Sequence, residues 1–215
     1  MKALPSPPRQ DAAYQLLRQW LTVGEVLPGQ RLKIHDIAQR LNLGVMPVRA
    51  ALQRLAAEGA LVNVPHAGVT VPKLSVAEFD DVLDARLMLE GTAAERGAHR
   101  IDADGVAALQ ELDLRMAQAL ERGDGKDYLT ANELFHLRLY QAAGSPMLMA
   151  LIETVWLKIG PLSNRLFDAE GASTVLNHAH DDAMQALLRR DCTGVRRAIE
   201  RDLFVAAQFL RPFCV

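Results

Sequence analysis

Residues 30–71 read QRLKIHDIAQRLNLGVMPVRAALQRLAAEGALVNVPHAGVTV, and this stretch decides the fold of the N-terminal part of the chain. Apolar side chains recur at helical spacing in two runs on either side of Asn42-Leu43-Gly44. The first run is Ile34, Ile37, Ala38 and Leu41, and the second is Val48, Ala51, Leu52 and Leu55. Pro47 falls in the first turn of the second run, where its missing N–H costs no hydrogen bond. The pattern predicts two short helices joined by a tight turn.

Two short alternating runs follow the second helix. Glu58-Gly59 supplies a helix stop, and apolar residues alternate before and after the turn-forming Pro65-His66-Ala67-Gly68. An earlier amphipathic run from Tyr14 to Leu21 adds a first helix. The order predicts a winged helix-turn-helix over residues 1–72, and such domains place their second helix in the major groove of DNA.

Charge is distributed unevenly between the two parts of the chain. The whole chain has 215 residues and a formal net charge of −2, but residues 1–75 carry nine basic and four acidic side chains. That segment is therefore +5, which leaves −7 for the remaining 140 residues. A modest basic excess is also ordinary surface chemistry, but together with the helix order it favours a polyanionic partner, double-stranded DNA.

From Ser75 onward the pattern indicates helices alone. Ser75 and Glu78 have the spacing of a capping box, and turn signals divide the rest of the chain into six helices. The breaks are at Ile101-Asp102, Gly123-Asp124-Gly125, Gly144-Ser145-Pro146, Gly171-Ala172-Ser173 and Arg190-Asp191. We expect a mainly α protein in which residues 73–76 link the winged helix-turn-helix to an all-α, six-helix antiparallel bundle over residues 77–215. Its few aromatic residues leave room for a small molecule between the helices.

Composition excludes several other classes of protein. The longest apolar run, near residues 147–157, is short and contains Glu153, and the N-terminus lacks the apolar core of a signal peptide. We therefore expect no membrane association and a cytoplasmic location. Cys192 and Cys214 lack metal-binding or redox spacing and are expected to be reduced thiols.

Several motifs in order resemble the GntR family of bacterial transcription regulators. They are Leu27-Pro28-Gly29-Gln30-Arg31-Leu32, Ile37-Ala38, Pro47-Val48-Arg49-Ala50-Ala51-Leu52 and Glu58-Gly59-Ala60-Leu61. The helical half resembles the FCD ligand-sensing domain of the FadR subfamily, through Arg86-Leu87-Met88-Leu89-Glu90, Asn132-Glu133-Leu134-Phe135-His136 and the His180 segment. Six helices rather than seven are typical of its VanR-like branch. The resemblance implies a homodimer that binds a palindromic operator and responds to a small metabolite, often a carboxylate.

The recognition segment departs from the family pattern. Gly44, Val45 and Met46 stand where the family usually has Ser-Arg-Thr, and His35 stands where it often has Arg. Arg49 is retained, and a guanidinium can make a bidentate pair with guanine in the major groove. The expected DNA-contacting residues are Arg31, His35, Met46, Arg49, Arg54, His66 and Gly68. For each Arg, a solvated surface charge is the alternative.

A candidate metal site is implied by the same resemblance. The family's ligands are one Asp and three His, and the corresponding residues here are Asn132, His136, His180 and Asp202. Two imidazoles and one carboxylate suit a divalent ion such as Zn, Ni, Mn or Fe. Without the resemblance, two His on separate helices would more often be core or rim residues.

Arg86 and Arg165 are candidates for binding a carboxylate effector. In the family the Arg at position 86 faces the pocket, where a guanidinium can clamp a carboxylate. The spacing from Arg86 to Glu90 equally allows a surface salt bridge across one helical turn. Both interpretations of Arg86 remain open from the sequence.

Two other classes of function have less support in the sequence. Glu133-Leu134-Phe135-His136 matches the Glu-x-x-His element of di-metal proteins, but a second copy, a nucleophile elbow, a P-loop and a dinucleotide motif are all missing from the sequence. We therefore expect no catalysis. A winged-helix protein with lost or altered DNA binding, acting as an interaction or small-molecule-binding module, is the alternative that Gly44-Val45-Met46 favours.

Overall fold

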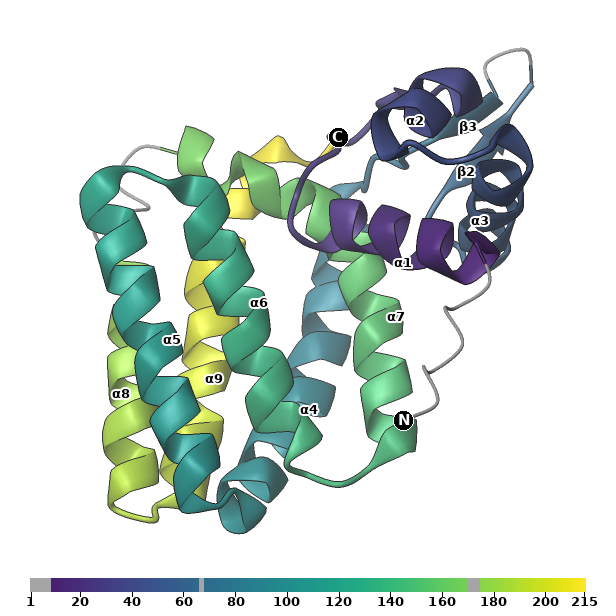
Figure 1. Cartoon of the computed structure of the whole chain (residues 1–215). Coiled ribbons are helices and arrows are strands. Elements are labelled where there is room, and N and C mark those ends of the chain that lie inside the picture. The colour runs from purple at the N-terminus through teal and green to yellow at the C-terminus, as the bar shows by residue number, and fades with distance from the viewer. Residues whose placement is uncertain (1–8, 66–67, 170–174) are drawn as a thin grey trace, which may run out of the picture.

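The computed structural model describes residues 9–65, 68–169 and 175–215. The N-terminal part contains α1 (Arg9–Thr22), β1 (Arg31–Leu32), α2 (Ile34–Leu41), α3 (Val45–Ala57), β2 (Val62–Val64) and β3 (Gly68–Thr70). The helical part contains α4 (Val76–Arg100), α5 (Ala103–Arg122), α6 (Gly125–Gln141), α7 (Pro146–Ser163), the 3-10 helix η1 (Asn164–Asp168), α8 (His178–Leu188), α9 (Cys192–Leu210) and the 3-10 helix η3 (Arg211–Phe213). The predicted winged helix-turn-helix and six-helix bundle are both confirmed in these residues (Figure 1).

The N-terminal domain is closed by a small antiparallel sheet. Its strand order is β1-β3-β2, with Leu32 opposite Val69 and Asn63 opposite the same residue on the other side. The hairpin of β2 and β3 was predicted, but β1 was not. Two residues are too few to show an alternating pattern, so β1 becomes visible only through its pairing with β3.

Helix boundaries in the bundle follow the expected chemistry. Ser75 Oγ accepts a hydrogen bond from the Glu78 amide at 3.3 Å, and the Ser75 amide donates to Glu78 Oε2 at 2.8 Å. This confirms the predicted capping box at the start of α4. Asp102, Asp124 and Asp191 cap α5, α6 and α9 in the same way. The predicted break at residues 171–173 lies outside the described residues.

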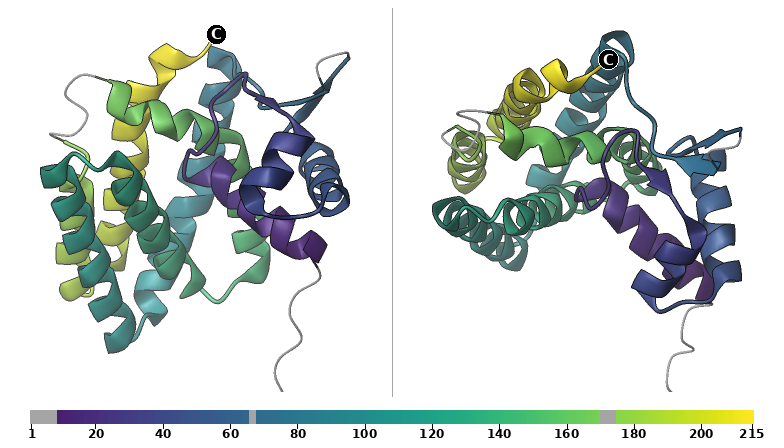
Figure 2. Two further views of the ribbon diagram at one scale, coloured as in Figure 1. Left: turned by 45° about the horizontal axis from the view of Figure 1, so that its top comes forward. Right: turned by 90° about the horizontal axis from the view of Figure 1, so that it is seen from above.

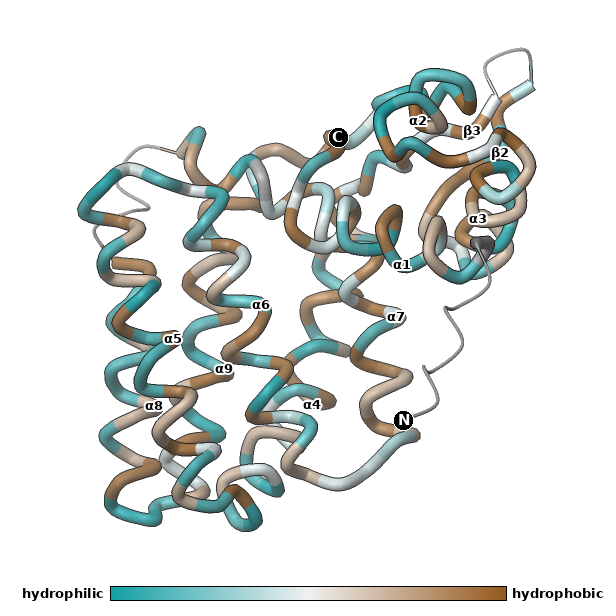
Figure 3. The backbone as a smooth tube through the Cα atoms, in the orientation of Figure 1, coloured by the Kyte–Doolittle hydropathy of each residue, from teal (hydrophilic) through white to brown (hydrophobic). Residues whose placement is uncertain are grey.

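Each domain has its own hydrophobic core. Hydrophilic and hydrophobic segments alternate turn by turn along the bundle helices, as their burial on one side requires (Figure 3). Leu157 of α7 belongs to the N-terminal core rather than to that of the bundle. Within the described residues, no helix combines the length and the apolar character that crossing a membrane needs.

The two domains pack against each other through α1 and α7, which lie side by side in both further views (Figure 2). Arg18 of α1 pairs with Glu153 of α7 at 2.9 Å. Glu25, just after α1, pairs with Lys126 of α6 and with Arg40 of α2. The end of α1 is therefore held against the helical bundle by charge as well as by apolar packing.

Candidate functional site

A basic concave surface lies on the N-terminal domain between α2, α3 and the hairpin. The cavity there measures about 520 Å³, and it is lined by Gly68 and by the polar side chains of Arg31, Lys33, His35, Asp36, Arg49, Gln53 and Asn63. Arg31 and Arg49 are exposed, and neither forms an ion pair with any residue that the structure describes. Four of the expected DNA-contacting residues, Arg31, His35, Arg49 and Gly68, are thus brought to one surface. Their charges are free to meet phosphate or guanine.

The start of α3 projects from this domain. Gly44 is its N-cap with extended backbone and no side-chain cap, and Met46 in the first turn is 69% exposed. Gly at an N-cap costs only a few tenths of a kcal/mol relative to Ser, so the helix begins normally. Met46 therefore stands at the N-terminus of the recognition helix, where helix-turn-helix proteins contact base edges.

Arg54 lies away from the basic concave surface and contacts other residues of its own domain. Its Nε lies 3.0 Å from Glu58 Oε1, and its guanidinium lies 3.7 Å from the centre of the Tyr14 ring. These partners belong to α1 and to the end of α3, and Arg54 does not line the basic concave surface. The remaining expected DNA contact, His66, lies outside the described residues.

Three buried side chains from three helices meet in the bundle. His136 of α6, His180 of α8 and Asp202 of α9 are each at most 8% exposed, and each offers a ligand atom within 4.8 Å of the others. His136 Nε2 lies 3.3 Å from Asp202 Oδ2 and 3.3 Å from His180 Nε2. We call this set the His-His-Asp triad. Its donor atoms are those that Zn and other divalent transition metals prefer.

Hydrogen bonding fixes the tautomer of His136. Tyr140 donates its hydroxyl proton to Glu90 Oε2 at 3.0 Å, and His136 Nδ1 lies 2.8 Å from the same hydroxyl. Because a phenol has only one proton, His136 Nδ1–H must be the donor in the second bond. Nε2 of His136 is thereby directed into the triad, where its lone pair would ligate a metal ion.

The groups around the triad favour a charged Asp202 and a neutral His180. Burial alone would raise the pKa of Asp202, but His180, His136 and Arg86 outweigh it, so the pKa of this carboxyl lies below its ordinary value. Burial lowers the pKa of His180, and the proximity of His136 lowers it further, against the opposing effect of Asp202. A carboxylate therefore faces two imidazoles in a dry interior, an arrangement that a bound cation would stabilise.

Arg86 forms the expected salt bridge to Glu90, but the pair is buried rather than at the surface. Arg86 Nε lies 2.5 Å from Glu90 Oε1, and the pair is buried, because Glu90 is 0% exposed and the Arg86 side chain 15%. Arg86 also lines a small cavity beside His136. The guanidinium, Glu90, Tyr140 and His136 form one continuous polar chain that ends at the triad.

The cavity beside His136 is small, about 50 Å³, and both domains contribute to its wall. Asn132, one turn before His136 on α6, lines it together with Trp156 of α7. The Trp156 indole nitrogen is buried and has no hydrogen-bond partner among the described residues. Thr22, the last residue of α1, closes the cavity from the N-terminal domain. We call this space the interdomain cavity.

Glu133 lies on the same wall. Burial raises the pKa of its carboxyl, while the neighbouring Thr22 hydroxyl and Arg18 lower it. Both of these neighbours belong to α1, so a bundle residue in the interdomain cavity interacts directly with the DNA-binding domain. Arg165, in contrast, pairs with Asp168 at 3.1 Å beside Phe213 and does not line this cavity.

Several residues of the site were not singled out from the sequence as site residues. Lys33, Gln53 and Asn63 lie on the basic concave surface, and Tyr140 and Trp156 lie beside the triad. Tyr140 is four residues after His136, so helical spacing could have indicated the contact. Trp156 and Thr22 carry no local signal, because only the docking of α1 on α7 brings them to the cavity.

Comparison with known proteins decides the family. The model of "Bacterial regulatory proteins, gntR family" matches residues 9–71, and the FCD domain model matches residues 81–204. The chain belongs to the GntR family. The HTH-type transcriptional regulator McbR of Escherichia coli is 31% identical over 185 residues, which cover 85% of this chain and 84% of McbR. The HTH-type transcriptional repressor RspR of the same organism is 27% identical, with 96% and 91% covered.

Solved structures agree with this GntR assignment. The structure of E. coli McbR/YncC superimposes with a TM-score of 0.87 at 28% identity and covers 93% of this chain and 95% of that one. A putative GntR regulator from Rhodococcus sp. RHA1 shares the fold, with a TM-score of 0.74 at 21% identity and 94% and 97% covered. This GntR protein is therefore a DNA-binding transcriptional regulator with a ligand-sensing FCD domain, and its relatives are named as regulators rather than as enzymes.

Proposed function

We propose that this regulator is a metabolite-responsive repressor of the bacterial cytoplasm, whose affinity for an operator changes when a small carboxylate enters the helical domain. The interdomain cavity carries the proposal, because one wall is Thr22 of the DNA-binding domain and the others belong to the bundle. A ligand in this cavity touches both domains at once. It can therefore interact differently with two arrangements of the domains, which is the requirement for coupling ligand binding to DNA binding.

The His-His-Asp triad would hold a divalent cation, with Zn, Ni, Mn and Fe as candidates. Three protein ligands leave coordination positions open, and the half-buried Asn132 lies one turn from His136. The observation that supports a metal is the convergence of His136 Nε2, His180 Nε2 and the Asp202 carboxylate, with Nε2 of His136 3.3 Å from each of the other two. A bound cation would supply positive charge for a ligand carboxylate.

The effector would replace contacts that the structure leaves incomplete. The Trp156 indole N–H offers a donor without a partner among the described residues, and Arg86 stands on the same wall. A cavity of about 50 Å³ is smaller than typical ligand sites of roughly 300–1,000 Å³. Binding a metabolite there therefore requires α1 to move away from α6 and α7. This is how an effector would shift the DNA-binding domain.

A homodimer completes the proposal. Helix-turn-helix dimers place two recognition helices about 34–36 Å apart, on successive turns of the duplex. Exposed apolar side chains on the bundle, Met88 of α4 at 65% and Phe204 of α9 at 54%, offer a surface for a second copy. Ligand-driven movement of α1 would change the spacing of the two recognition helices.

The experiment is a titration of operator DNA with the metal-loaded and the chelator-treated protein, with and without a panel of small carboxylates. Genomic fragments select the operator, and elemental analysis of the purified protein identifies the metal. We expect at least one carboxylate to change operator affinity in the metal-loaded protein only. Equal affinity under every condition would contradict the effector proposal, while the absence of a selected fragment would contradict operator binding.

A further inference from the structure

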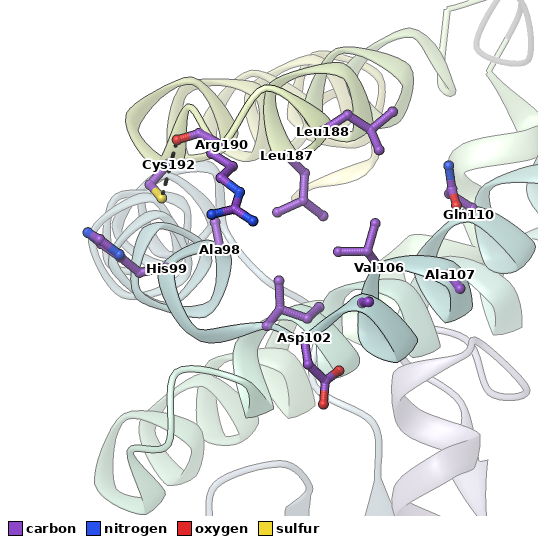
Figure 4. A pocket seen from close by; sticks show the side chains of 12 residues that line it. Ala98, His99, Asp102, Val106, Ala107, Gln110, Leu187, Leu188, Arg190 and Cys192 are labelled. Atoms are coloured by element: carbon purple, nitrogen blue, oxygen red, sulfur yellow. Dashed lines mark hydrogen bonds between the residues drawn. The ribbon is translucent and has the colours of Figure 1, made fainter.

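A second and larger cavity lies at the end of the bundle that is remote from the DNA-binding domain. It measures about 550 Å³ and opens between the C-terminal ends of α4 and α8 and the N-terminal ends of α5 and α9 (Figure 4). This volume is within the range of small-molecule sites. Its lining is mixed: His99, Asp102, Gln110 and Arg190 are polar, and the apolar side chains are those of Ala98, Ile101, Val106, Leu187 and Leu188. We call it the distal cavity.

Arg190 occupies an unusual backbone position at this cavity. Its φ is 57°, in the left-handed region that favours glycine. Its amide donates to the Leu187 carbonyl at 3.0 Å, and the Asp191 amide donates to the Ala186 carbonyl at 2.9 Å. This is the Schellman arrangement that ends a helix, and its left-handed residue is usually glycine.

The same arrangement ends three other helices of this chain. Gly59 follows α3, Gly123 follows α5 and Asn42 follows α2, with φ values of 73°, 67° and 52° and equivalent hydrogen bonds. Asn tolerates the left-handed region better than most residues with a side chain, so Arg190 is the least suited of the four to this conformation. Strained positions of this kind are concentrated at functional sites. The chain therefore places an Arg where glycine would be more stable.

The position of the Arg190 side chain gives a reason for an Arg at this left-handed position. This side chain extends into the distal cavity (Figure 4), and its guanidinium has no hydrogen-bond or ion-pair partner in residues 9–65, 68–169 and 175–215. The nearby acids are engaged as helix caps: Asp102 accepts from the Gly105 amide and Asp191 from the Gly194 amide, each at 2.8 Å. The Asp102 carboxylate points away from the cavity (Figure 4). Arg190 is exposed to solvent, and its unpaired positive charge lies beside the apolar side chains of the cavity.

We propose that the distal cavity binds an organic monocarboxylate, with Arg190 holding the carboxylate and the apolar walls holding its hydrocarbon body. A guanidinium makes two parallel hydrogen bonds with a carboxylate, and aliphatic walls favour a ligand with an apolar chain or ring. A dianionic phosphate is less well matched, because Arg190 is the single Lys or Arg among the described residues that line the cavity. This site is separate from the His-His-Asp triad and does not depend on the function proposed for it.

The test is calorimetric titration with octanoate and 4-phenylbutyrate, each compared with its primary amide. All titrations contain a chelator, which removes any contribution of a metal in the triad. We expect both acids to bind about tenfold or more tightly than their uncharged amides. Arg190→Gly should abolish this preference, while Arg189→Ala, which removes the neighbouring exposed charge outside the cavity, should leave it intact.

Arg190→Gly also separates a ligand role from a structural one. Because glycine suits the left-handed backbone, the melting temperature of this variant should equal or exceed that of the wild type while its carboxylate binding is lost. Val106→Phe, which fills the cavity and keeps the charge, should weaken both acids and both amides. Wild-type protein that fails to prefer the acids at millimolar concentration, or Arg190→Gly that binds them as the wild type does, would overturn the proposal.

Discussion

Gly160 of α7 lies directly against the backbone of Leu21 of α1. A Cβ added at Gly160 would lie 2.2 Å from the Leu21 carbonyl oxygen, which is far closer than atoms of this kind approach each other. The DNA-binding domain and the bundle therefore meet backbone to backbone, next to the interdomain cavity that Thr22 and Gly160 line. Because the two domains are in direct contact here, a ligand in the cavity would lie against the domain that carries the recognition helix.

Gly160→Ala should loosen this docking. Alanine is about 1 kcal/mol better than glycine in a helix interior, but here its methyl group must push α1 away from α7. We expect faster amide hydrogen exchange in α1 and a loss of effector control over DNA binding. Gly44→Ala is the control, because its Cβ would meet Pro47 only at an ordinary 3.5 Å. Unchanged exchange in α1 of Gly160→Ala would contradict the close contact.

Tyr140→Phe should weaken metal binding without removing a ligand. The hydroxyl of Tyr140 orients His136 and also hydrogen-bonds the buried Glu90. Loss of such an outer partner typically lowers metal affinity by about 10–100-fold. The matched control is Tyr128→Phe on the same helix, whose hydroxyl donates to the Leu176 carbonyl instead. Competition titration with a zinc-binding dye measures both variants, and equal affinities would count against the orienting role.

Arg86→Leu should be strongly destabilising, because it leaves the Glu90 carboxylate buried without its cation. Removal of one partner from a buried ion pair costs about 3–5 kcal/mol in free energy of unfolding. The double variant Arg86→Leu with Glu90→Gln should recover a large part of that loss, since no uncompensated charge remains. Urea unfolding followed by circular dichroism gives both values. A single variant as stable as the wild type would show that the pair is not buried.

Arg49 and Arg54 should behave differently although both lie on α3. Arg49→Ala should weaken operator binding by about 1–3 kcal/mol and relax sequence preference, because Arg49 is exposed on the basic concave surface. Arg54→Ala should leave operator affinity nearly unchanged and lower the stability slightly, because Arg54 contacts Tyr14 and Glu58. The two variants are compared by DNA anisotropy and by urea unfolding. An equal loss of DNA affinity in both would contradict this division.

Much of the fold could be predicted because its signals are local. Caps such as Ser75 with Glu78, and stops such as Glu58-Gly59, act within one helical turn, so they can be read along the sequence. The contacts between the domains depend instead on how α1 docks on α7. Nothing in the sequence around Gly160 or Thr22 indicates this docking.

The candidate site shows the same limit. The residues of the triad could be named through the family resemblance, and the structure brings His136, His180 and Asp202 together. The contact of Arg54 with Tyr14 could not be foreseen, although helical spacing allows its pair with Glu58, because an exposed Arg on a recognition helix has the same sequence pattern whether it faces DNA or α1. Arg190 is missed for a different reason, since its strained backbone appears only in three dimensions.

The most direct test of DNA binding by the basic concave surface is the salt dependence of operator binding, measured by fluorescence anisotropy for the wild type and for Arg31→Ala with Arg49→Ala. Each phosphate contact contributes a slope of about −0.9 to a plot of log affinity against log salt. The account predicts selective binding with a steep slope in the wild type, and lower affinity, weaker sequence preference and a slope shallower by about one contact in the double variant, since Arg31 contacts phosphate and Arg49 contacts a base. Equal slopes and affinities for the two proteins would contradict it.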